Sequence, residues 1–248
     1  MEAYLDNSAT TRVDAQVQEL MKKLMDVDFG NPSSRHQKGV VAEGYIKEAR
    51  QKIAATLKVD PKELIITSGG TESNNMALIG TALAAKRKGN HIITTAVEHP
   101  SVKATASFLE EQGFRITFLS VDSRGQISLE ELKEALTPDT ILVSIMYVNN
   151  EIGTIQPVEE AAKLVHATVP GAVFHVDAIQ AYGKVMIRPK QQGIDLLSVS
   201  SHKFHGPKGA GFLYCSGKVN LHPIIFGGGQ QSGMRSGTEN VPGAAGMG

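Results

Sequence analysis

The chain is organised around the segment SVSSHKFHGPKGAG, residues 198–211, which places a lysine between hydroxyl groups, two histidines and a glycine-rich exit. The preceding run, residues 194–197, is largely apolar and predicts a buried strand. A lysine at the end of a buried strand is costly unless it is paired or neutral, and a lysine with a lowered pKa acts as a nucleophile toward carbonyl groups. Lys203 is therefore a candidate nucleophile, with a solvated lysine in a polar loop as the alternative.

The regions flanking this segment alternate between short apolar runs and stretches with apolar positions at helical spacing. Strands that alternate with helices of about 10–15 residues predict an α/β fold with a mostly parallel sheet flanked by helices on both faces. The near-continuous apolar strands fit burial on both sides. The expected helices are residues 14–26, 38–57, 72–87, 101–112, 128–136 and 157–167, and the expected strands are residues 63–67, 91–95, 115–119, 140–146, 173–176, 194–199 and 210–214.

The composition is that of a soluble globular protein. The 248 residues can bury a sizeable core, and 25 basic residues balance 25 acidic ones without a basic block, so neither nucleic acid nor a membrane surface is the expected partner. A single cysteine excludes a disulfide framework and fits a reducing compartment. The N-terminus lacks the features of a signal peptide, and no window approaches about 18 apolar residues. We therefore expect a cytoplasmic protein.

Polar clusters follow five of the expected strands. In parallel sheets the ligand lies at the carboxyl ends of the strands, so these clusters are expected to gather around one site. They are residues 68–75, 96–100, 149–153, 177–180 and the segment that contains Lys203.

The first cluster, SGGT at residues 68–71, opens an expected helix. Two glycines allow the backbone to approach a ligand closely, and the first-turn amides with the helix dipole favour a phosphate group. The alternative is a simple turn with a serine or threonine cap. The glycine spacing matches neither a dinucleotide fingerprint nor a P-loop.

Asp177 ends an apolar strand, where an unpaired carboxylate would cost several kcal/mol. It either caps the next segment or faces a cation, such as a protonated heteroaromatic nitrogen. Pyridoxal 5′-phosphate (PLP) needs an acidic partner on its ring nitrogen, a lysine and a phosphate cup. The residues that match these needs are Asp177, Lys203 and the helix start at Gly70 and Thr71, with Ser200 and His202 as further phosphate donors and Gln180 near Asp177.

His99 follows a strand and precedes a proline, which allows it to stack on a flat ring or to transfer protons, with a structural histidine as the alternative. A metal site is a rival reading of His175, Asp177, His202 and His205, which are ligand types. A lysine beside these ligands would repel a cation, so we expect no metal. Cys215 has no adjacent base or helix start, which predicts a buried inert thiol rather than a nucleophile.

The last part of the chain, residues 226–240, is too glycine-rich for a packed element and predicts a loop, either ordered or flexible. Arg235 and Thr238 suit an anion, and Thr238 could instead cap a helix that begins near residue 241. The sequence ends shortly after that helix begins, so we expect it to be a fragment of a longer chain.

Eight motifs, in this order, resemble those of the N-terminal two-thirds of a cysteine desulfurase of the NifS/IscS type, in the class V aminotransferase group of fold type I PLP enzymes. They are YLDNSATT at 4–11, FGNPSS at 29–34, TSGGTESNN at 67–75, EHPS at 98–101, VNNEIG at 148–153, HVDAIQ at 175–180, SSHK at 200–203 and RSGTEN at 235–240. The resemblance implies the PLP-dependent transferase fold, with residues 1–15 belonging to the small domain, residues 16–248 forming the large PLP-binding domain, and the C-terminal part of the small domain missing.

The resemblance also implies a role for each matching residue. Lys203 would hold PLP covalently and later abstract a substrate proton, and His99 would stack on the ring and assist proton transfer. Asp177 would pair with the ring nitrogen and Gln180 with the ring hydroxyl. The remaining implied positions are Gly70, Thr71, Ser200 and His202 at the phosphate, Thr238 at the phosphate of the other subunit of a homodimer, Asn150 beside the cofactor and Asn31 near the substrate.

The implied activity is the conversion of L-cysteine to L-alanine, with transfer of persulfide sulfur to an acceptor protein of iron–sulfur cluster assembly or tRNA thiolation. The family's nucleophilic cysteine and its carboxylate-binding arginine belong to the C-terminal part, and Cys215 does not match that cysteine motif. We therefore expect these 248 residues to be inactive alone. The alternatives are a selenocysteine lyase or other class V PLP lyase, and a non-catalytic scaffold with the same fold.

Overall fold

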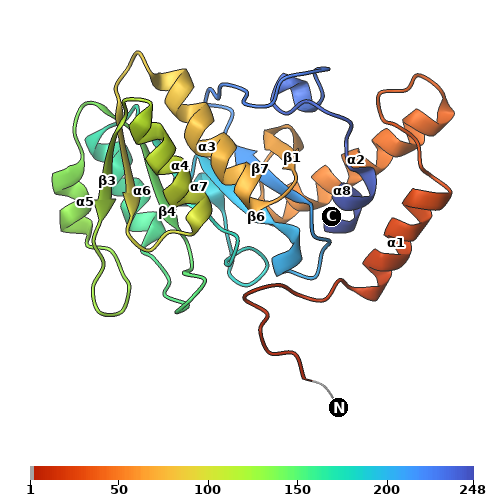
Figure 1. Cartoon of the computed structure of the whole chain (residues 1–248), viewed down its shortest axis with the longest axis horizontal. Helices are drawn as coiled ribbons and strands as arrows, with labels where there is room; N and C mark the ends of the chain where they lie inside the picture. The colour runs from red at the N-terminus through yellow and green to blue at the C-terminus, as the bar shows by residue number, and fades with distance from the viewer. Residues whose placement is uncertain (1–2) are drawn as a thin grey trace.

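A computed structural model of the chain describes residues 3–248. Its centre is a seven-stranded sheet with helices on both faces (Figure 1). In sheet order the strands are β1 (Leu64–Thr67), β7 (Gly211–Cys215), β6 (Leu196–Ser200), β5 (Val173–Asp177), β4 (Thr140–Met146), β2 (His91–Thr95) and β3 (Arg115–Leu119).

The pairing from β6 through β5, β4 and β2 to β3 is parallel, whereas β7 runs antiparallel to both β6 and β1. The mostly parallel sheet expected from the sequence is therefore confirmed. Every residue of β4 and β6 is buried, as expected for strands covered on both faces. The parallel direction brings the carboxyl ends of β2, β4, β5 and β6 to the same edge.

The six helices expected by range differ from the observed ones by no more than two residues at either end, whereas the four-residue helix α7 (Pro189–Gln192) was not expected. The observed helices are α1 (Ala15–Asp26), α2 (Gln37–Leu57), α3 (Gly70–Ala85), α4 (Pro100–Glu111), α5 (Leu129–Ala135), α6 (Val158–Thr168), α7 and α8 (Val241–Met247), with the 3₁₀ turns η1 (Pro61–Glu63), η2 (Ser201–Lys203) and η3 (Gln231–Gly233). None of the helices within residues 3–248 is long and apolar enough to span a membrane.

Two apolar cores lie on opposite faces of the sheet. One contains buried side chains of α3 and α4, and the other contains those of α2, α5, α6 and α8. Alternate strand residues supply the two cores: Leu196 belongs to the first, and Leu197 and Val199 to the second. Packing on both faces thus fixes the sheet, and it also fixes the positions of the residues that follow the strands at the carboxyl edge.

The N-terminal segment crosses this edge and contacts the turn after β6. Thr11 N donates to the carbonyl of His202 at 2.8 Å, and Asp14 N donates to the carbonyl of His205 at 3.0 Å. The assignment of residues 1–15 to a separate small domain stays a prediction, and Met1 and Glu2 lie outside the described residues. The described part of the segment forms one wall of the cavity discussed below.

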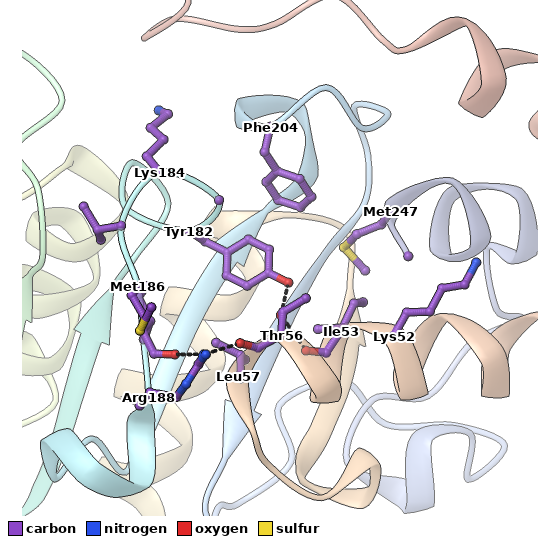
Figure 2. A pocket seen from close by; sticks show the side chains of 14 residues that line it. Lys52, Ile53, Thr56, Leu57, Tyr182, Lys184, Met186, Arg188, Phe204 and Met247 are labelled. Carbon is purple, nitrogen blue, oxygen red and sulfur yellow. Dashed lines mark hydrogen bonds between the residues drawn. The ribbon is translucent and has the colours of Figure 1, made fainter.

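A cavity of about 510 Å³ lies beside α2 (Figure 2). The Tyr182 hydroxyl lies 2.7 Å from Thr56 Oγ1, and its ring packs edge-to-face on Phe204 at 5.0 Å. Arg188 donates to the carbonyls of Thr56 and Ile187. The charged residues that line this cavity are all basic, so it offers no acid–base pair.

Candidate functional site

A larger cavity, of about 850 Å³, lies at the carboxyl edge of the sheet between the N-terminal segment, the start of α3 and the turn after β6. It brings together nine of the eleven residues singled out from the sequence. These are Gly70, Thr71, His99, Asn150, Asp177, Gln180, Ser200, His202 and Lys203. Their gathering is a structural result, whereas their roles toward a ligand stay predictions.

The start of α3 has the backbone geometry that the predicted phosphate site requires. Gly69 has φ 144°, a conformation open to glycine, and the helix has no side-chain cap. A β-carbon at Gly70 would lie 2.1 Å from Ile179 Cδ1, so only glycine fits without displacing that side chain. The first-turn amides of a 16-residue helix then point toward the cavity, where they favour a phosphate group.

Asp177 is the last residue of β5 and is almost fully buried. Its Oδ1 accepts from Ile179 N at 3.0 Å, and its Oδ2 accepts from Asn74 Nδ2 at 2.8 Å. Burial raises the pKa of Asp177, and the two hydrogen bonds, His99 and Lys203 only partly oppose it. A cation placed in the cavity against this carboxyl group would stabilise its ionised form.

Lys203 ends η2 and is partly buried. Its Nζ donates to the carbonyls of Ser8 at 2.5 Å and Ala9 at 2.8 Å, so the N-terminal segment holds the amine at the cavity wall. Burial and then Lys184 lower the pKa of Lys203, against the opposite influence of Asp6 and Asp177. A lowered pKa increases the share of free amine, the form that attacks carbonyl groups.

The neighbours of Lys203 are held by the same segment. His202 Nδ1 lies 3.1 Å from Thr10 Oγ1, and burial followed by the charges of Lys203 and Lys208 lowers the pKa of His202. Gln180 Nε2 donates to the carbonyl of Ser8 at 2.8 Å, and its Oε1 accepts from Lys184 Nζ. The amide of Gln180 is thus already engaged by protein groups, a detail that the sequence pattern did not predict.

Glu98 fixes the loop that carries His99 through two hydrogen bonds. Glu98 Oε1 accepts from Thr95 Oγ1 at 2.9 Å and from Met146 N at 2.8 Å. Burial, and after it the charge of Asp177, raises the pKa of Glu98 to about 8, so the group is mostly neutral at pH 7. Asn149 Nδ2 adds a bond to the carbonyl of Val97 at 3.0 Å. The end of β4 therefore sets the position of His99.

Two of the predicted site residues lie outside the cavity. Asn31 is exposed, and its Oδ1 accepts from Ser33 N at 3.0 Å. Thr238 is exposed as well, and the expectation that it caps α8 is wrong, because Asn240 Oδ1 accepts from Gly243 N at 3.0 Å. The assignment of Thr238 to the phosphate of a second subunit stays a prediction.

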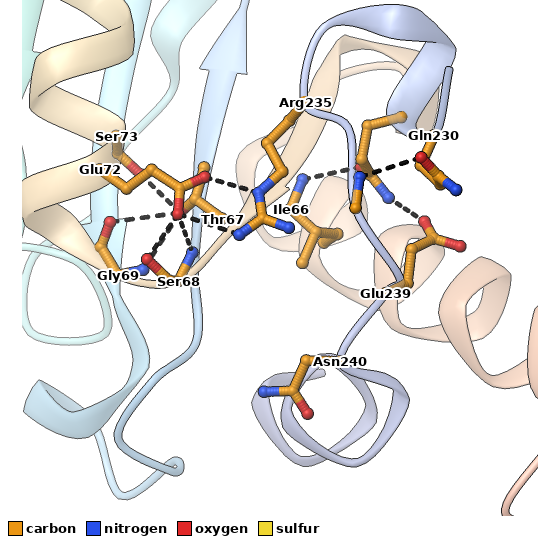
Figure 3. Close-up of polar contacts among 12 residues, drawn as sticks. Ile66, Thr67, Ser68, Gly69, Glu72, Ser73, Gln230, Arg235, Glu239 and Asn240 are labelled. Atoms are coloured by element: carbon orange, nitrogen blue, oxygen red, sulfur yellow. Dashed lines mark hydrogen bonds and ion pairs between the residues drawn. The ribbon is translucent and has the colours of Figure 1, made fainter. Parts of the chain in front are cut away.

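Arg235 is not a free anion-binding group, contrary to the expectation from the sequence. Its Nε lies 2.8 Å from Glu72 Oε1 (Figure 3), and Glu72 Oε2 accepts from Ser68 N at 3.0 Å and from Ser68 Oγ at 2.5 Å. The pair therefore ties the glycine-rich segment 226–240 to the turn that begins α3. This contact favours the ordered alternative for the segment.

Replacing Arg235 by alanine is expected to destabilise the fold by about 1–3 kcal/mol, because a largely buried carboxylate loses its charged partner. Burial raises the pKa of Glu72, but the bonds from Arg235 and Ser68 outweigh it and leave the pKa below its ordinary value. The stabilisation is therefore present at neutral pH and is lost as pH falls through the lowered pKa.

Urea unfolding at pH 7 and at pH 3 measures this effect. The difference in the free energy of unfolding between wild type and Arg235→Ala should shrink at pH 3. Arg87 is exposed and lies just beyond α3, so the Arg87→Ala variant should unfold like wild type at both pH values. A gap of the same size at both pH values would contradict the assigned role of the ion pair.

Cys215 lies in β7, away from the main cavity, and lines a different one with Glu63 and Lys190. Burial, followed by the charges of Glu63 and Asp195, raises the pKa of its thiol to about 12. The thiol is thus protonated at neutral pH. This agrees with the expectation of an inert cysteine.

Three buried or half-buried polar residues next to the site were absent from the sequence-derived set: Asn74, Glu98 and Ser101. A signal for Asn74 was available, because it lies one helical turn after Gly70 and therefore faces the same side of α3. Glu98 and Ser101 flank His99 within one motif, but nothing in their spacing indicates what they contact. Residues 3–248 contain no group of three or more histidine, cysteine, aspartate or glutamate side chains placed to bind a metal ion.

Known proteins have sequences similar to this chain over nearly its whole length. The chain is 51% identical over 244 residues to the putative cysteine desulfurase IscS 1 of Bacillus subtilis (strain 168), which covers 98% of this chain and 64% of that protein. It is 50% identical over 247 residues to cysteine desulfurase IscS of Dictyoglomus turgidum, which covers 100% of this chain and 62% of that protein. The chain thus spans less than two thirds of the length of these relatives.

Solved structures agree with the sequence comparison. A NifS-like protein superposes with a TM-score of 0.97 at 45% identity, covering 100% of this chain and 68% of that one. SspA, solved in complex with cysteine, superposes with a TM-score of 0.95 at 40% identity, covering 99% of this chain and 71% of that one. These likenesses confirm the fold expected from the sequence. The model of the class V aminotransferases matches residues 3–248, and the chain therefore belongs to the aminotransferase class-V family.

Proposed function

We propose that the protein is the PLP-binding part of a cysteine desulfurase, which converts L-cysteine to L-alanine and passes persulfide sulfur to an acceptor protein of iron–sulfur cluster assembly or tRNA thiolation. One observation carries the proposal. A lysine amine with a lowered pKa, a buried carboxyl group and an uncapped helix N-terminus line the same cavity. The similarity to proteins named cysteine desulfurase supports the choice of reaction.

The residues present fit the phosphate group, the ring nitrogen and the aldehyde group of PLP. The amides of α3, with Gly70 leaving room, would hold the phosphate together with Ser200 and His202. Asp177 would face the ring nitrogen and keep it protonated, because a facing cation would offset the burial that raises the pKa of this carboxyl group. Lys203 would bind the aldehyde carbon through its amine.

When bound, PLP supplies an electron sink that makes the α-proton of an amino acid acidic. Lys203, once its amine is free again, would take that proton, because its lowered pKa leaves part of the amine unprotonated. His99 lies on the cavity wall with its ring fixed by Ser101, so it can hold a hydrogen bond toward the reacting groups without moving.

The sulfur must be taken by a thiol that residues 1–248 do not supply. Cys215 has a pKa raised to about 12 and lines a different cavity, whereas a sulfur nucleophile needs an accessible thiolate. The proposal therefore assigns desulfuration to a chain that contains these residues together with such a thiol. It also includes a homodimer in the cytoplasm, in which Thr238 serves the site of the second subunit.

Two other functions are less well supported. A selenocysteine lyase would use the same cofactor residues, but the relatives compared here carry the name cysteine desulfurase. A non-catalytic scaffold would not need a buried Asp177 opposite an open helix start, since an unpaired buried carboxyl group only lowers stability.

The proposal is tested with two purified proteins, the 248-residue chain and the longer chain that contains it. Both should bind PLP with an absorbance band near the visible region, and only the longer chain should form alanine and a protein persulfide from L-cysteine. Alanine and persulfide formation by the 248-residue chain alone would contradict the assignment of the thiol. Absence of PLP binding by both chains would contradict the proposal as a whole.

A further inference from the structure

Two buried polar side chains join His99 to Asp177. Asn74 on α3 is fully buried, and Ser101 in the first turn of α4 is 8% exposed. Asn74 Nδ2 lies 2.8 Å from Asp177 Oδ2 and 2.9 Å from Ser101 Oγ. Ser101 Oγ in turn lies 2.8 Å from His99 Nδ1. The four residues thus form one continuous chain of hydrogen bonds, which we name the His99–Asp177 chain.

The direction of each bond in this chain follows from the chemistry of the groups. An ionised Asp177 carboxylate only accepts, and Asn74 turns its NH₂ group toward it. The same NH₂ group supplies the bond to Ser101 Oγ, which therefore acts as an acceptor. The Ser101 hydroxyl proton is then left to point at its other neighbour, His99 Nδ1.

A second donor reaches the same nitrogen of His99. The backbone N–H of Ser101 lies 3.1 Å from Nδ1, where His99 caps α4. A ring nitrogen that accepts from both an O–H and an N–H uses its lone pair and carries no proton. The neutral ring must therefore carry its proton on Nε2. His99 lines the cavity, and Nε2 has no hydrogen-bond partner among residues 3–248.

We propose that Asn74 and Ser101 are positioning residues that hold His99 in the Nε2–H tautomer, and that they transmit the orientation set by the Asp177 carboxylate to the His99 ring. This inference deepens the proposed function. In this tautomer His99 presents an N–H donor to the cavity and cannot accept a proton there through Nε2. His99 would then donate a hydrogen bond, while the α-proton passes to another group of the cavity wall, which the proposed function takes to be Lys203.

The tautomer can be measured directly in the 248-residue chain without cofactor or substrate. The chain is labelled with ¹⁵N-histidine, and long-range ¹H–¹⁵N spectra distinguish the protonated ring nitrogen from the unprotonated one. The His99 signals are assigned among the eight histidines as those missing from a His99→Gln sample. The expected result is a ring protonated at Nε2 with Nδ1 as an acceptor. A His99 ring protonated at Nδ1 would overturn the inference.

Variants of Ser101 and Asn74 test whether the other hydrogen bonds of the His99–Asp177 chain affect the His99 ring. Ser101→Ala should shift the Nδ1 resonance, and Ser101→Thr should restore it by returning the hydroxyl group. Asn74→Ala should shift the same resonance although Asn74 does not contact His99, because the Ser101 hydroxyl then loses its fixed direction. Asn75→Ala and Ser107→Ala are matched controls on the same helices and should leave the resonance unchanged.

An unchanged Nδ1 resonance in a folded Asn74→Ala protein would show that Asn74 has a structural role alone. If Asn74→Ala does not fold, the wild-type tautomer and the Ser101→Ala and Ser101→Thr pair still decide the inference. Because the NMR samples contain no PLP, the predicted tautomer can prove wrong while PLP binding and desulfuration are still observed. The reverse outcome is also possible, so the two proposals are tested separately.

Discussion

Replacing Lys203 by alanine is expected to abolish covalent attachment of PLP. The side-chain amine that forms the bond is removed, and no other amine of residues 3–248 is held against the Ser8 and Ala9 carbonyls. The visible absorbance band should disappear, and borohydride should no longer fix the cofactor to the protein. In the longer chain, loss of proton transfer alone should lower the rate of desulfuration on the order of 10²–10⁴-fold.

Lys208→Ala is the matched control, because Lys208 also lines the cavity and is exposed. This variant should keep both the absorbance band and the borohydride-fixed cofactor. Retention of the band by Lys203→Ala, with its loss in Lys208→Ala, would transfer the role to the other lysine. Both spectra are recorded on the 248-residue chain, so they do not depend on the sulfur-accepting thiol.

Replacing Asp177 by asparagine is expected to have two opposite effects. Binding of PLP should weaken by about 2–5 kcal/mol, because a buried charged partner of the protonated ring nitrogen is lost. The free chain, in contrast, should become more stable at neutral pH. Burial raises the pKa of Asp177, so the folded state holds its proton more tightly than the unfolded state. Asp177 therefore lowers stability progressively as pH rises above its unfolded pKa.

Titration with PLP and urea unfolding at pH 7 measure the two effects on the same samples. A stabilised chain with weakened PLP binding would show that Asp177 is retained for a ligand cation. A chain that is destabilised and binds PLP as wild type does would show that Asp177 serves the fold. Asp195→Asn is a useful comparison, since burial also raises the pKa of Asp195, which contacts Phe174 N and His166 away from the cavity.

The fold was largely predictable from the sequence because its signals are local. Most strands are short apolar runs, and most helices have apolar spacing with an identifiable start, such as Ser128 for α5 or His99 with Pro100 for α4. The short helix α7, with the sequence PKQQ, has no such pattern and was not expected. The antiparallel direction of β7 was not predicted. It depends on the pairing of β7 with both β1 and β6, and such pairing leaves no mark within the strand itself.

The site was predictable to the extent that its residues follow strands. Asp177, Ser200 and Lys203 lie at or just after the ends of β5 and β6, and parallel strands must bring such residues together. Contacts between distant segments could not be predicted in this way. Arg235 and Glu72 are 163 residues apart, and only the folded chain shows that the arginine neutralises Glu72 instead of binding an anion.

Asn74 and Ser101 illustrate a further limit of sequence reasoning. Both were visible inside recognisable motifs, but a buried asparagine on a helix is a common structural residue. Their bonds to Asp177 and His99 define a function only when all four positions are known.

The central claim is that Lys203 is the residue that binds PLP, and peptide mapping tests it most directly. The 248-residue chain is mixed with PLP, reduced with borohydride and digested, and the modified peptide is sequenced by mass spectrometry. We expect the reduced pyridoxyl group on Lys203, with Lys184 and Lys208 unmodified in the same sample. Modification of Lys184 or Lys208 in place of Lys203, or no modified lysine at all, would contradict the claim.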